Sequence, residues 1–494
     1  MRRRRVRASL LALLGATLPA ACTLGPDYHA PPRMSLPARF AAASLLPAAR
    51  AQPPPAALAA WWTQFHDGEL SGLIAQALHG NLDLQAAASR VRVARDELII
   101  AGAARFPQIN GDASVDALHL SKNSGISEFT SLFSGGGSSG ASSGFTLPGL
   151  NITTYSLGFD ASWELDLFGG VRRSMQAAEA QAEQAVWSQR DSEVAIAAEV
   201  ANDYWELRAL QGEIRIADDE VQRQRELLRL QQARRRYGFV TEQQVRSQAA
   251  QLEQTRAALP DLDSALQAQI HALGVLVGET PEALQAQLSA PRALPPPPPA
   301  IPVGLPSELL RRRPDVRAAE RALAASSARI GVAIDALYPK IDLTGAVDLV
   351  SVDLKHLLDI ASRQYNVAGG LSAPLFDAGR GKASVRIAEE QNRQALYAYQ
   401  STVLGALRDV EDALTRYGDQ LKKDQALRAA SSDAQAAADI ARQQFQQGLI
   451  NIGPVLTSES AALQTRMQLA QSEGALAGDL VSLYEALGGG WSQR

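Results

Sequence analysis

The chain has 494 residues, and its 48 lysine and arginine residues against 52 aspartate and glutamate residues give a formal net charge of −4. So small a charge gives no support to nucleic-acid binding. Hydrophobic residues make up 46% of the chain and aromatic residues only 5%, a composition typical of long helices. The single cysteine, Cys22, excludes a disulfide within the chain.

The first 21 residues have the pattern of a secretory signal peptide. Arginines at positions 2–5 precede a short apolar stretch over residues 10–19, and two alanines come just before Cys22. The apolar stretch is too short for a stable transmembrane helix. A cysteine at this place is typical of bacterial lipoproteins, so we predict that Cys22 receives diacylglycerol, with palmitate as an acyl chain. Thr23 follows it, which predicts sorting to the outer membrane. The alternative is an ordinary signal peptide with an incidental cysteine.

From residue 61 onward the chain passes through the same series of elements twice. Residues 81–87 recur as residues 313–319, and residues 106–109 recur as residues 338–341. We therefore predict four parts after the signal peptide: a lipid-anchored tether over residues 22–60, a first repeat over 61–290, a proline-rich linker over 291–306 and a second repeat over 307–494.

Each repeat contains two segments in which apolar and polar residues alternate, which is the period of a β-strand. The predicted strands cover residues 107–118 and 153–167 in the first repeat, and 341–351 and 364–376 in the second. Their polar positions carry six acidic side chains: Asp112, Asp116, Asp160, Glu164, Asp342 and Asp348. The segments taken alone would also fit a soluble sheet with one solvated face.

A long helix follows each pair of strands, and a shorter helix follows each long one. Residues 172–236 contain no proline and one glycine, and their apolar residues recur every seven positions, as in a helix that supercoils against neighbours. The second long helix is predicted over 382–446, and the shorter helices over 242–277 and 454–487. Gly238 and Gly448 follow the long helices and suit left-handed C-terminal caps. Taken alone, such a helix would also fit a plain coiled-coil spacer.

The strand lengths constrain the assembly. Strands of about 9–12 residues with one apolar face can cross an outer membrane at a tilt. Four strands cannot close a barrel, and an open edge in lipid leaves backbone groups unsatisfied, so the protein should oligomerise. A dimer would give eight strands with a filled interior, whereas a trimer would give twelve and leave a channel. The acidic faces would then line a water-filled lumen.

Five stretches resemble the TolC-type outer membrane factors, especially the lipoprotein branch that serves multidrug efflux pumps of the RND type. They are Cys22-Thr23-Leu24-Gly25-Pro26-Asp27-Tyr28, Trp61-Trp62, Trp163-Glu164-Leu165-Asp166-Leu167-Phe168-Gly169, Arg312-Arg313-Pro314-Asp315-Val316 and Pro374-Leu375-Phe376-Asp377-Ala378-Gly379-Arg380. The resemblance implies a mainly α-helical homotrimer with a twelve-stranded β-barrel continued by an α-helical periplasmic tunnel. It also implies a lipid-anchored position in the outer membrane, a periplasmic adaptor and an inner-membrane pump.

In this family the turns that end the long helices point away from the membrane and meet the adaptor. By position these turns are Gly238, Phe239, Val240 and Thr241, and Gly448, Leu449, Ile450 and Asn451. Apolar residues on such turns favour docking. The family often narrows the tunnel with aspartates early in the shorter helices. This chain has Gln244, Pro454 and Thr457 there, with Glu242 and Glu459 as the nearest acids, so the gate is not transferred.

No pattern indicates an enzyme, a cofactor or a metal site. The six histidines are scattered, and the Gly-x-Ser-x-Gly matches at residues 136–140 and 140–144 fall in a Gly- and Ser-rich loop and not in a strand-turn-helix elbow. We predict a passive exit duct for drugs or other small toxic compounds. One alternative is the exit duct of a type I protein-secretion system, which shares the architecture. Another is a periplasmic coiled-coil scaffold without a pore. Lipidation and the Arg-Arg-Pro-Asp-Val stretch favour efflux.

Overall fold

The computed structural model describes residues 23–31, 34–45, 49–50, 58–119, 151–295, 298, 301–302, 306 and 311–491. The predicted signal peptide and Cys22 lie outside the described residues. The chain divides into two compact units, and each draws on both sequence repeats. The sheet unit comprises the described residues within 1–28, 96–179 and 324–392, and the helical unit comprises those within 29–95, 180–323 and 393–494. The two sequence repeats therefore do not correspond to the two compact units, because each unit contains residues from both repeats.

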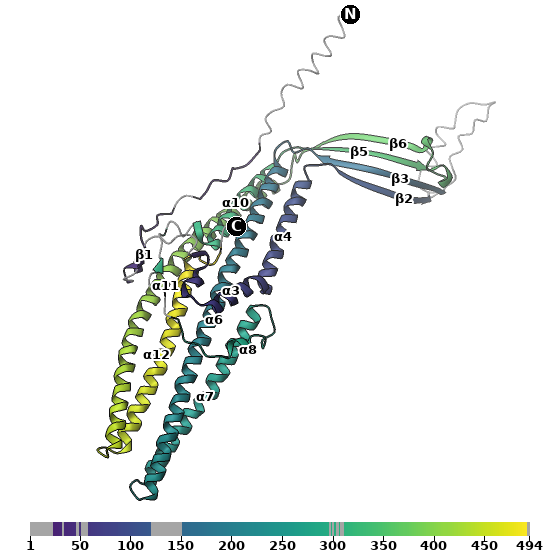
Figure 1. The fold of residues 1–494 in the computed structure, drawn as a ribbon. Helices are drawn as coiled ribbons and strands as arrows, with labels where there is room; N and C mark the ends of the chain where they lie inside the picture. Colours follow the sequence, from purple (N-terminus) through teal and green to yellow (C-terminus); the bar gives the residue numbers. More distant parts are fainter. Residues whose placement is uncertain are drawn as a thin grey trace, which may run out of the picture. The chain divides into compact units, whose positions relative to one another are not determined.

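The sheet unit is built on four antiparallel strands in the order β2-β3-β5-β6 (Figure 1). They are β2 (Gln108–His119), β3 (Asn151–Glu164), β5 (Lys340–Ser351) and β6 (Arg363–Ser372). The register pairs even-numbered residues with even-numbered residues throughout, as at Asp112, Gly158 and Asp348. Because every neighbouring pair is antiparallel, the two edge strands, β2 and β6, run in opposite directions.

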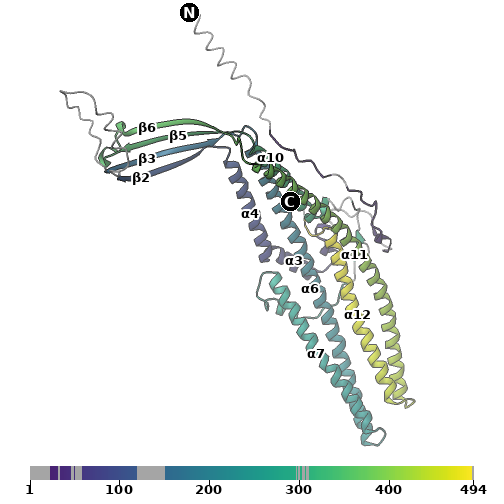
Figure 2. The ribbon, with the colours of Figure 1, turned by 180° about the vertical axis from the view of Figure 1, so that it is seen from behind.

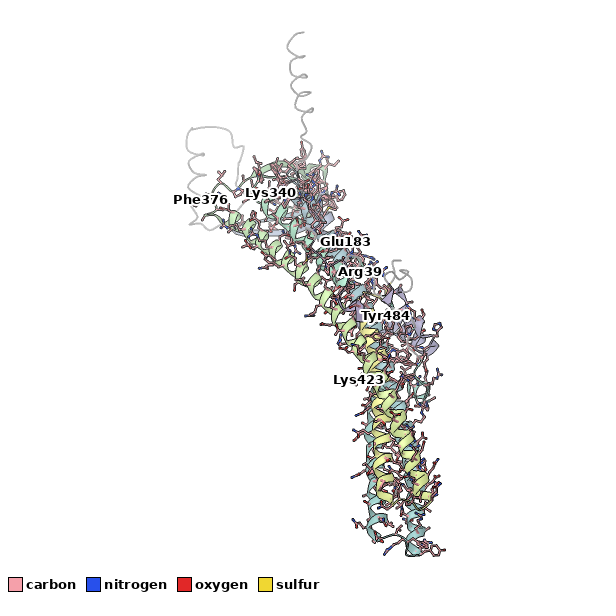
Figure 3. All side chains as sticks on the ribbon, turned by 90° about the vertical axis from the view of Figure 1, so that its left-hand side faces the viewer. Arg39, Glu183, Lys340, Phe376, Lys423 and Tyr484 are labelled. Carbon is pink, nitrogen blue, oxygen red and sulfur yellow. The ribbon has the colours of Figure 1, made fainter. Side chains whose placement is uncertain are left out.

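Two strands end earlier than predicted. β3 ends at Glu164 and not at residue 167, because the chain turns there and the Leu167 N–H donates to the Leu165 carbonyl at 2.8 Å. β6 ends at Ser372 and not at residue 376, shortly before Pro374, which has no N–H for a ladder. Beyond this point Phe376 is 91% exposed (Figure 3).

The long helices are α6 (Gly170–Arg236) and α11 (Arg380–Gln446), and the shorter ones that follow them are α7 (Glu242–Leu276) and α12 (Ile452–Ala486). Three further helices are α3 (Gly68–Gly80), α4 (Leu82–Ala103) and α10 (Pro314–Asp335). In the helical unit α6 lies beside α7, and α11 lies beside α12 (Figures 1 and 2). Among the described residues, no helix is both long and apolar enough to cross a membrane.

The remaining described elements are short. They are η1 (Ala42–Leu45), β1 (Ala49–Arg50), η2 (Trp61–Phe65), α8 (Gln285–Leu288), β4 (Ile301–Pro302), η3 (Leu354–His356) and η4 (Ile360–Ser362). β1 and β4 pair in parallel within the helical unit. This pair joins the N-terminal segment to the segment between the two repeats.

An aspartate shortly before each long helix accepts hydrogen bonds from backbone N–H groups at the start of that helix. The Asp166 carboxylate accepts hydrogen bonds from the N–H groups of Val171 and Arg172 at 3.1 and 3.2 Å. The Asp377 carboxylate accepts from the N–H groups of Gly381 and Gly379 at 2.7 and 2.9 Å, and these bonds hold the pKa of Asp377 below its usual range. Carboxylates stabilise helix N-termini in this way. The two aspartates therefore fix where sheet becomes helix.

In the helical unit, shorter helices meet end to end. The Asn81 side chain, between α3 and α4, donates to the carbonyl of Leu276 at the end of α7, at 2.9 Å. In the second repeat the Arg313 guanidinium, just before α10, donates to the carbonyl of Ala486 at the end of α12, at 3.3 Å. Each repeat thus builds a second column beside its long helix.

An aromatic cluster forms the centre of the helical unit. Trp61 stacks on Tyr484, with ring centroids 5.2 Å apart and planes at 9°, and both side chains are buried. Phe65 contacts Trp205 of α6, with centroids 5.0 Å apart. Buried aromatic side chains of this size contribute strongly to hydrophobic stabilisation.

A buried ionic network ties α3 to α6 beside this cluster. The Arg208 side chain, 1% exposed, forms an ion pair with Glu69 and donates to the Gln211 amide oxygen at 2.7 Å and the Ala290 carbonyl at 3.1 Å. Its guanidinium lies 4.8 Å from the ring centroid of Tyr204, whose hydroxyl donates to Asp67. A buried charge with this many partners holds its neighbours in one arrangement.

Asp203 on α6 leads to a prediction about pH. Burial, together with the charges of Glu199 and Glu206, raises the pKa of Asp203 to about 6. The folded state then binds more protons than the unfolded state between about pH 4 and 6, so stability falls as the pH rises through this window. We expect Asp203→Asn to stabilise the fold by about 1–2 kcal/mol at pH 7.5 and to change little at pH 4. Thermal unfolding followed by circular dichroism at both pH values checks this, and an equal shift at both would contradict it.

Candidate functional site

The two faces of the sheet differ in chemistry as the alternation predicts. The six predicted lumen residues, Asp112, Asp116, Asp160, Glu164, Asp342 and Asp348, all occupy even positions and therefore share one face. On that face Asn110 donates to Asp160 at 3.2 Å, and Lys340 pairs with Glu164 at 2.8 Å. That these acids line a lumen remains a prediction.

The odd-numbered face is apolar and exposed in the single chain. Its members include Ile109, Phe159, Trp163, Val347 and Val367. The exposed fractions of Phe159 and Val367 are 67% and 83%. A sheet with one wet face and one apolar face of this size matches the wall of a membrane channel.

The two predicted docking turns have the same backbone design. Gly238 and Gly448 have φ angles of 76° and 77°, so each chain reverses through the left-handed region after its long helix. The N–H of the residue after each glycine donates a hydrogen bond to a carbonyl five residues earlier in the chain. The Phe239 N–H donates to the Arg234 carbonyl at 3.0 Å, and the Leu449 N–H donates to the Gln444 carbonyl at 2.9 Å. This bond satisfies a carbonyl that the helix end leaves free. Thr241 and Asn451 then cap α7 and α12.

Both turns line one groove of about 780 Å³ in the helical unit. Phe239 and Leu449 are 78% and 69% exposed, while Val240 and Ile450 are half-buried. Arg234 also lines this groove, and its guanidinium lies 4.5 Å from the Phe445 ring centroid. Tyr237 and Phe445 line it as well and were not among the residues predicted from the sequence. Their position directly beside the two glycines was the available signal. That the groove receives a partner remains a prediction.

The turn glycines carry a second prediction. A Cβ built on Gly238 or Gly448 meets nothing within 4 Å, so a substitution there strains only the backbone. We expect Gly448→Val to cost about 1–2 kcal/mol locally and to speed amide exchange in that turn, whereas Gly448→Asn costs less. Gly212→Ala inside α6, where a Cβ also has open space, is the matched control and should stabilise slightly. Unchanged exchange in Gly448→Val would contradict the prediction.

The acids nearest the familiar gate position have partners within the chain. Glu459 is 5% exposed and pairs with Arg442 at 3.2 Å, and its burial raises its pKa. Glu242 pairs with Arg246 at 2.8 Å on the same helix. Gln244 belongs to the capping box of Thr241, and Thr457 donates to the Gly453 carbonyl at 3.2 Å. Each of these side chains therefore has an interaction partner within the chain.

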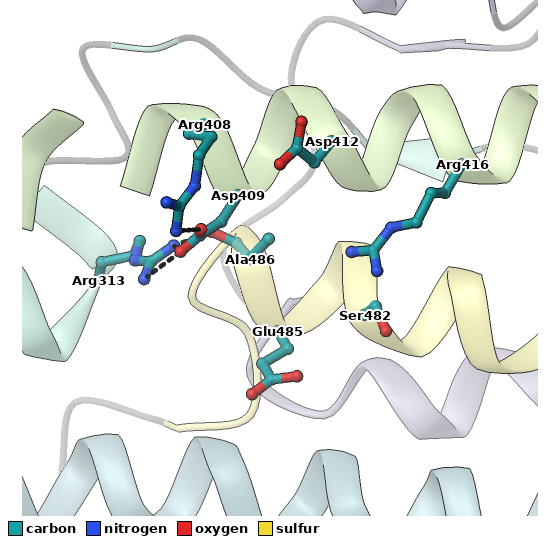
Figure 4. Close-up of a pocket in the computed structure, with 8 residues that line it drawn as sticks. All are labelled: Arg313, Arg408, Asp409, Asp412, Arg416, Ser482, Glu485 and Ala486. Carbon is teal, nitrogen blue, oxygen red and sulfur yellow. Dashed lines mark hydrogen bonds and ion pairs between the residues drawn. The ribbon is translucent and has the colours of Figure 1, made fainter. Parts of the chain in front are cut away.

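The Arg-Arg-Pro-Asp-Val stretch forms a joint in the helical unit. Arg313 pairs with Asp315 at 2.7 Å and with Asp409 of α11 at 3.2 Å, as Figure 4 shows for Asp409. A pocket of about 440 Å³ opens beside it, lined by Arg313, Arg408, Asp409, Asp412, Arg416, Ser482, Glu485 and Ala486. Its charges are mixed, and burial raises the pKa of Glu485. The joint therefore fixes α10, α11 and α12 together.

The residues that the structure describes contain no group of three or more His, Cys, Asp or Glu side chains placed to hold a metal ion.

Comparisons with known proteins agree with this arrangement. A family model described as outer membrane efflux protein matches residues 73–279 and 305–489, close to the two repeats. The cation efflux system protein CusC of Escherichia coli strain CFT073 is 31% identical over 488 residues, covering 96% of both chains. The pyoverdine export outer membrane protein OpmQ of Pseudomonas putida is 30% identical over 437 residues, covering 87% of this chain and 88% of its own. The solved structure of the outer-membrane channel OprN is 34% identical and covers 95% of this chain and all of that one, with a TM-score of 0.82.

Proposed function

Because the chain belongs to the outer membrane efflux protein family, we propose that it is the exit duct for drugs or other small toxic compounds in a three-part efflux system. It is an outer membrane channel with a periplasmic extension, works as a homotrimer, and has a periplasmic adaptor and an inner-membrane pump as partners. The observation that carries the proposal is the four-stranded sheet with one acidic and one apolar face, joined directly to capped helices of 67 residues.

The edges of the sheet explain why more than one chain is needed. Four strands leave backbone groups on β2 and β6 without partners, which is costly in lipid. Since β2 and β6 run in opposite directions, β6 of one chain can pair antiparallel with β2 of the next. Three chains then give the twelve strands of an open barrel. The acidic even-numbered face would line its interior and the apolar face would meet lipid.

The named relatives do not share one cargo, since one is named for cation efflux and another for pyoverdine export. A duct contacts its cargo loosely, so we assign the choice of compound to the pump. The test is deletion of the gene, followed by growth in the presence of dyes, antibiotics, copper and silver salts. Raised sensitivity to at least one class, restored by the cloned gene, is the expected result.

The same strains separate the alternatives. Unchanged sensitivity together with loss of a protein from the culture medium would replace efflux by type I secretion. The scaffold alternative predicts a soluble protein after Cys22→Ser. A trimer that still requires detergent after that change would reject it.

A further inference from the structure

The first described residues of the chain, Thr23 to Tyr28, lie against the helical end of the sheet within the sheet unit. The Leu24 N–H donates to the Phe168 carbonyl at 3.0 Å, just after β3. Arg173, in the first turn of α6, is 3% exposed and directs its guanidinium at the same segment. The sequence predicts a lipid-anchored tether here, and the structure holds the first described residues of that tether against Phe168 and Arg173.

The guanidinium of Arg173 makes four hydrogen bonds, and three of them go to the N-terminal segment. Its Nε donates to the Leu24 carbonyl at 3.0 Å, and its Nη2 donates to the Gly25 carbonyl at 3.0 Å and to Asp27 at 2.9 Å. The fourth bond, from Nη1, goes to Gln176 at 2.9 Å. Arginine suits this arrangement because its planar fork presents fixed donors to several acceptors at once. Among the described residues, the Gln176 amide oxygen is the one hydrogen-bond acceptor of the Arg173 guanidinium outside this segment.

Two glycines make the close approach possible. A Cβ on Gly25 would lie 2.5 Å from the Cα of Gly331 on α10, and Gly25 also has a φ of 87°. A Cβ on Gly331 would lie 2.7 Å from the Cγ of Arg173. Gly331 therefore leaves room both for the N-terminal segment and for the stem of Arg173. The backbone of the N-terminal segment and the side chain of Arg173 therefore both pack directly against the backbone of α10 at Gly331.

We propose that Arg173, Gly331 and the Phe168 carbonyl form a docking site for the first residues of the mature chain, which holds the acylated end of the protein at the periplasmic end of the sheet. Thr23 is joined to Cys22 by one peptide bond, so a lipid on Cys22 is tied to the place where Arg173 holds Leu24 and Gly25. The site couples the lipid anchor to insertion of the strands. This inference rests on the predicted acylation of Cys22 and, for its membrane readout, on the outer-membrane function proposed above.

Chymotrypsin cleavage after Tyr28 of the purified, acylated trimer tests the docking. Local opening controls such cleavage, so we expect Arg173→Gln to speed it about tenfold or more, and Arg173→Lys to speed it less. Arg172→Gln is the matched control, since its neighbouring guanidinium pairs with Asp166 and should leave the rate unchanged. Gly25→Val opens the site from the other side without touching Arg173. Cleavage of the unaltered protein as fast as Arg173→Gln would overturn the docking site.

A second experiment separates coupling to the lipid from mere stabilisation. The fraction of SDS-resistant trimer in the outer membrane is compared for Arg173→Gln, Cys22→Ser and the double variant. We expect Arg173→Gln to lower this fraction in the acylated protein and to have no further effect in the Cys22→Ser background. An equal loss in both backgrounds would mean that Arg173 only stabilises the fold, and would overturn the coupling. Neither readout uses drug sensitivity, so a failure here is distinct from a failure of the proposed function.

Discussion

Cells that carry the double variant Phe239→Asp and Leu449→Asp should become as sensitive to the exported compounds as cells without the gene. The two side chains project from neighbouring turns into one groove and are largely exposed in the chain alone. A charge at either place would have to be desolvated by any partner that covers it. We expect each change to weaken adaptor binding by about 2–4 kcal/mol, which is roughly 30-fold to 1000-fold in affinity.

The control for this experiment is Val275→Asp, an apolar position that is 59% exposed at the far end of α7. It should leave adaptor binding unchanged, as measured by pull-down with the purified adaptor. The double variant should still form trimers in the outer membrane, because neither side chain belongs to the buried core. Full drug resistance with both aspartates present would show that the adaptor docks elsewhere.

Arg208→Met should destabilise the protein by about 3 kcal/mol, which is the largest folding effect we expect from a single change. The substitution leaves Glu69, whose side chain is 6% exposed, with Arg292 as its remaining ionic partner at 3.1 Å. It also removes donors to Gln211 and to the Ala290 carbonyl. Buried acceptors that lose their donors account for most of the cost.

The melting temperature of the helical signal in circular dichroism measures this effect. Arg246→Met is the matched control, because that arginine is 80% exposed and pairs with Glu242 one turn away. Exposed pairs of this kind contribute about 0.5 kcal/mol or less. If both variants melt together, the Arg208 network is no more important than a surface ion pair.

Regular patterns in the sequence were sufficient to predict the elements, because each pattern reports a local geometry. Alternation over β3 identified both faces of the sheet, and the two turn glycines marked the ends of the long helices. The ends of β3 and β6 were placed too late, since a turn at Leu165 and the missing N–H of Pro374 act on single residues. Such local interruptions are weak against a twelve-residue pattern.

The ionic clusters could not be predicted in the same way. Arg208 and Glu69 are 139 residues apart, and Arg173 is 149 residues from Leu24. A lone arginine on a helix looks like part of a solvated face until the tertiary structure supplies its partner. Conversely, Asp166 and Asp377 belong to stretches that the sequence marked by resemblance, and the structure shows that their carboxylates cap the long helices.

The opposite directions of β2 and β6 determine how assembly proceeds as well as how it ends. One chain has two unpaired edges, and so does an open row of two or three chains, since each junction removes two edges while each new chain adds two. The free-energy cost of unpaired backbone N–H and C=O groups in lipid is therefore the same for every open row, and it disappears only when the last junction forms. Closure is therefore an all-or-none event, and open rows of chains are unstable in the membrane. A single chain with a damaged edge keeps the whole ring open, so such a defect is dominant over the intact copies that join it.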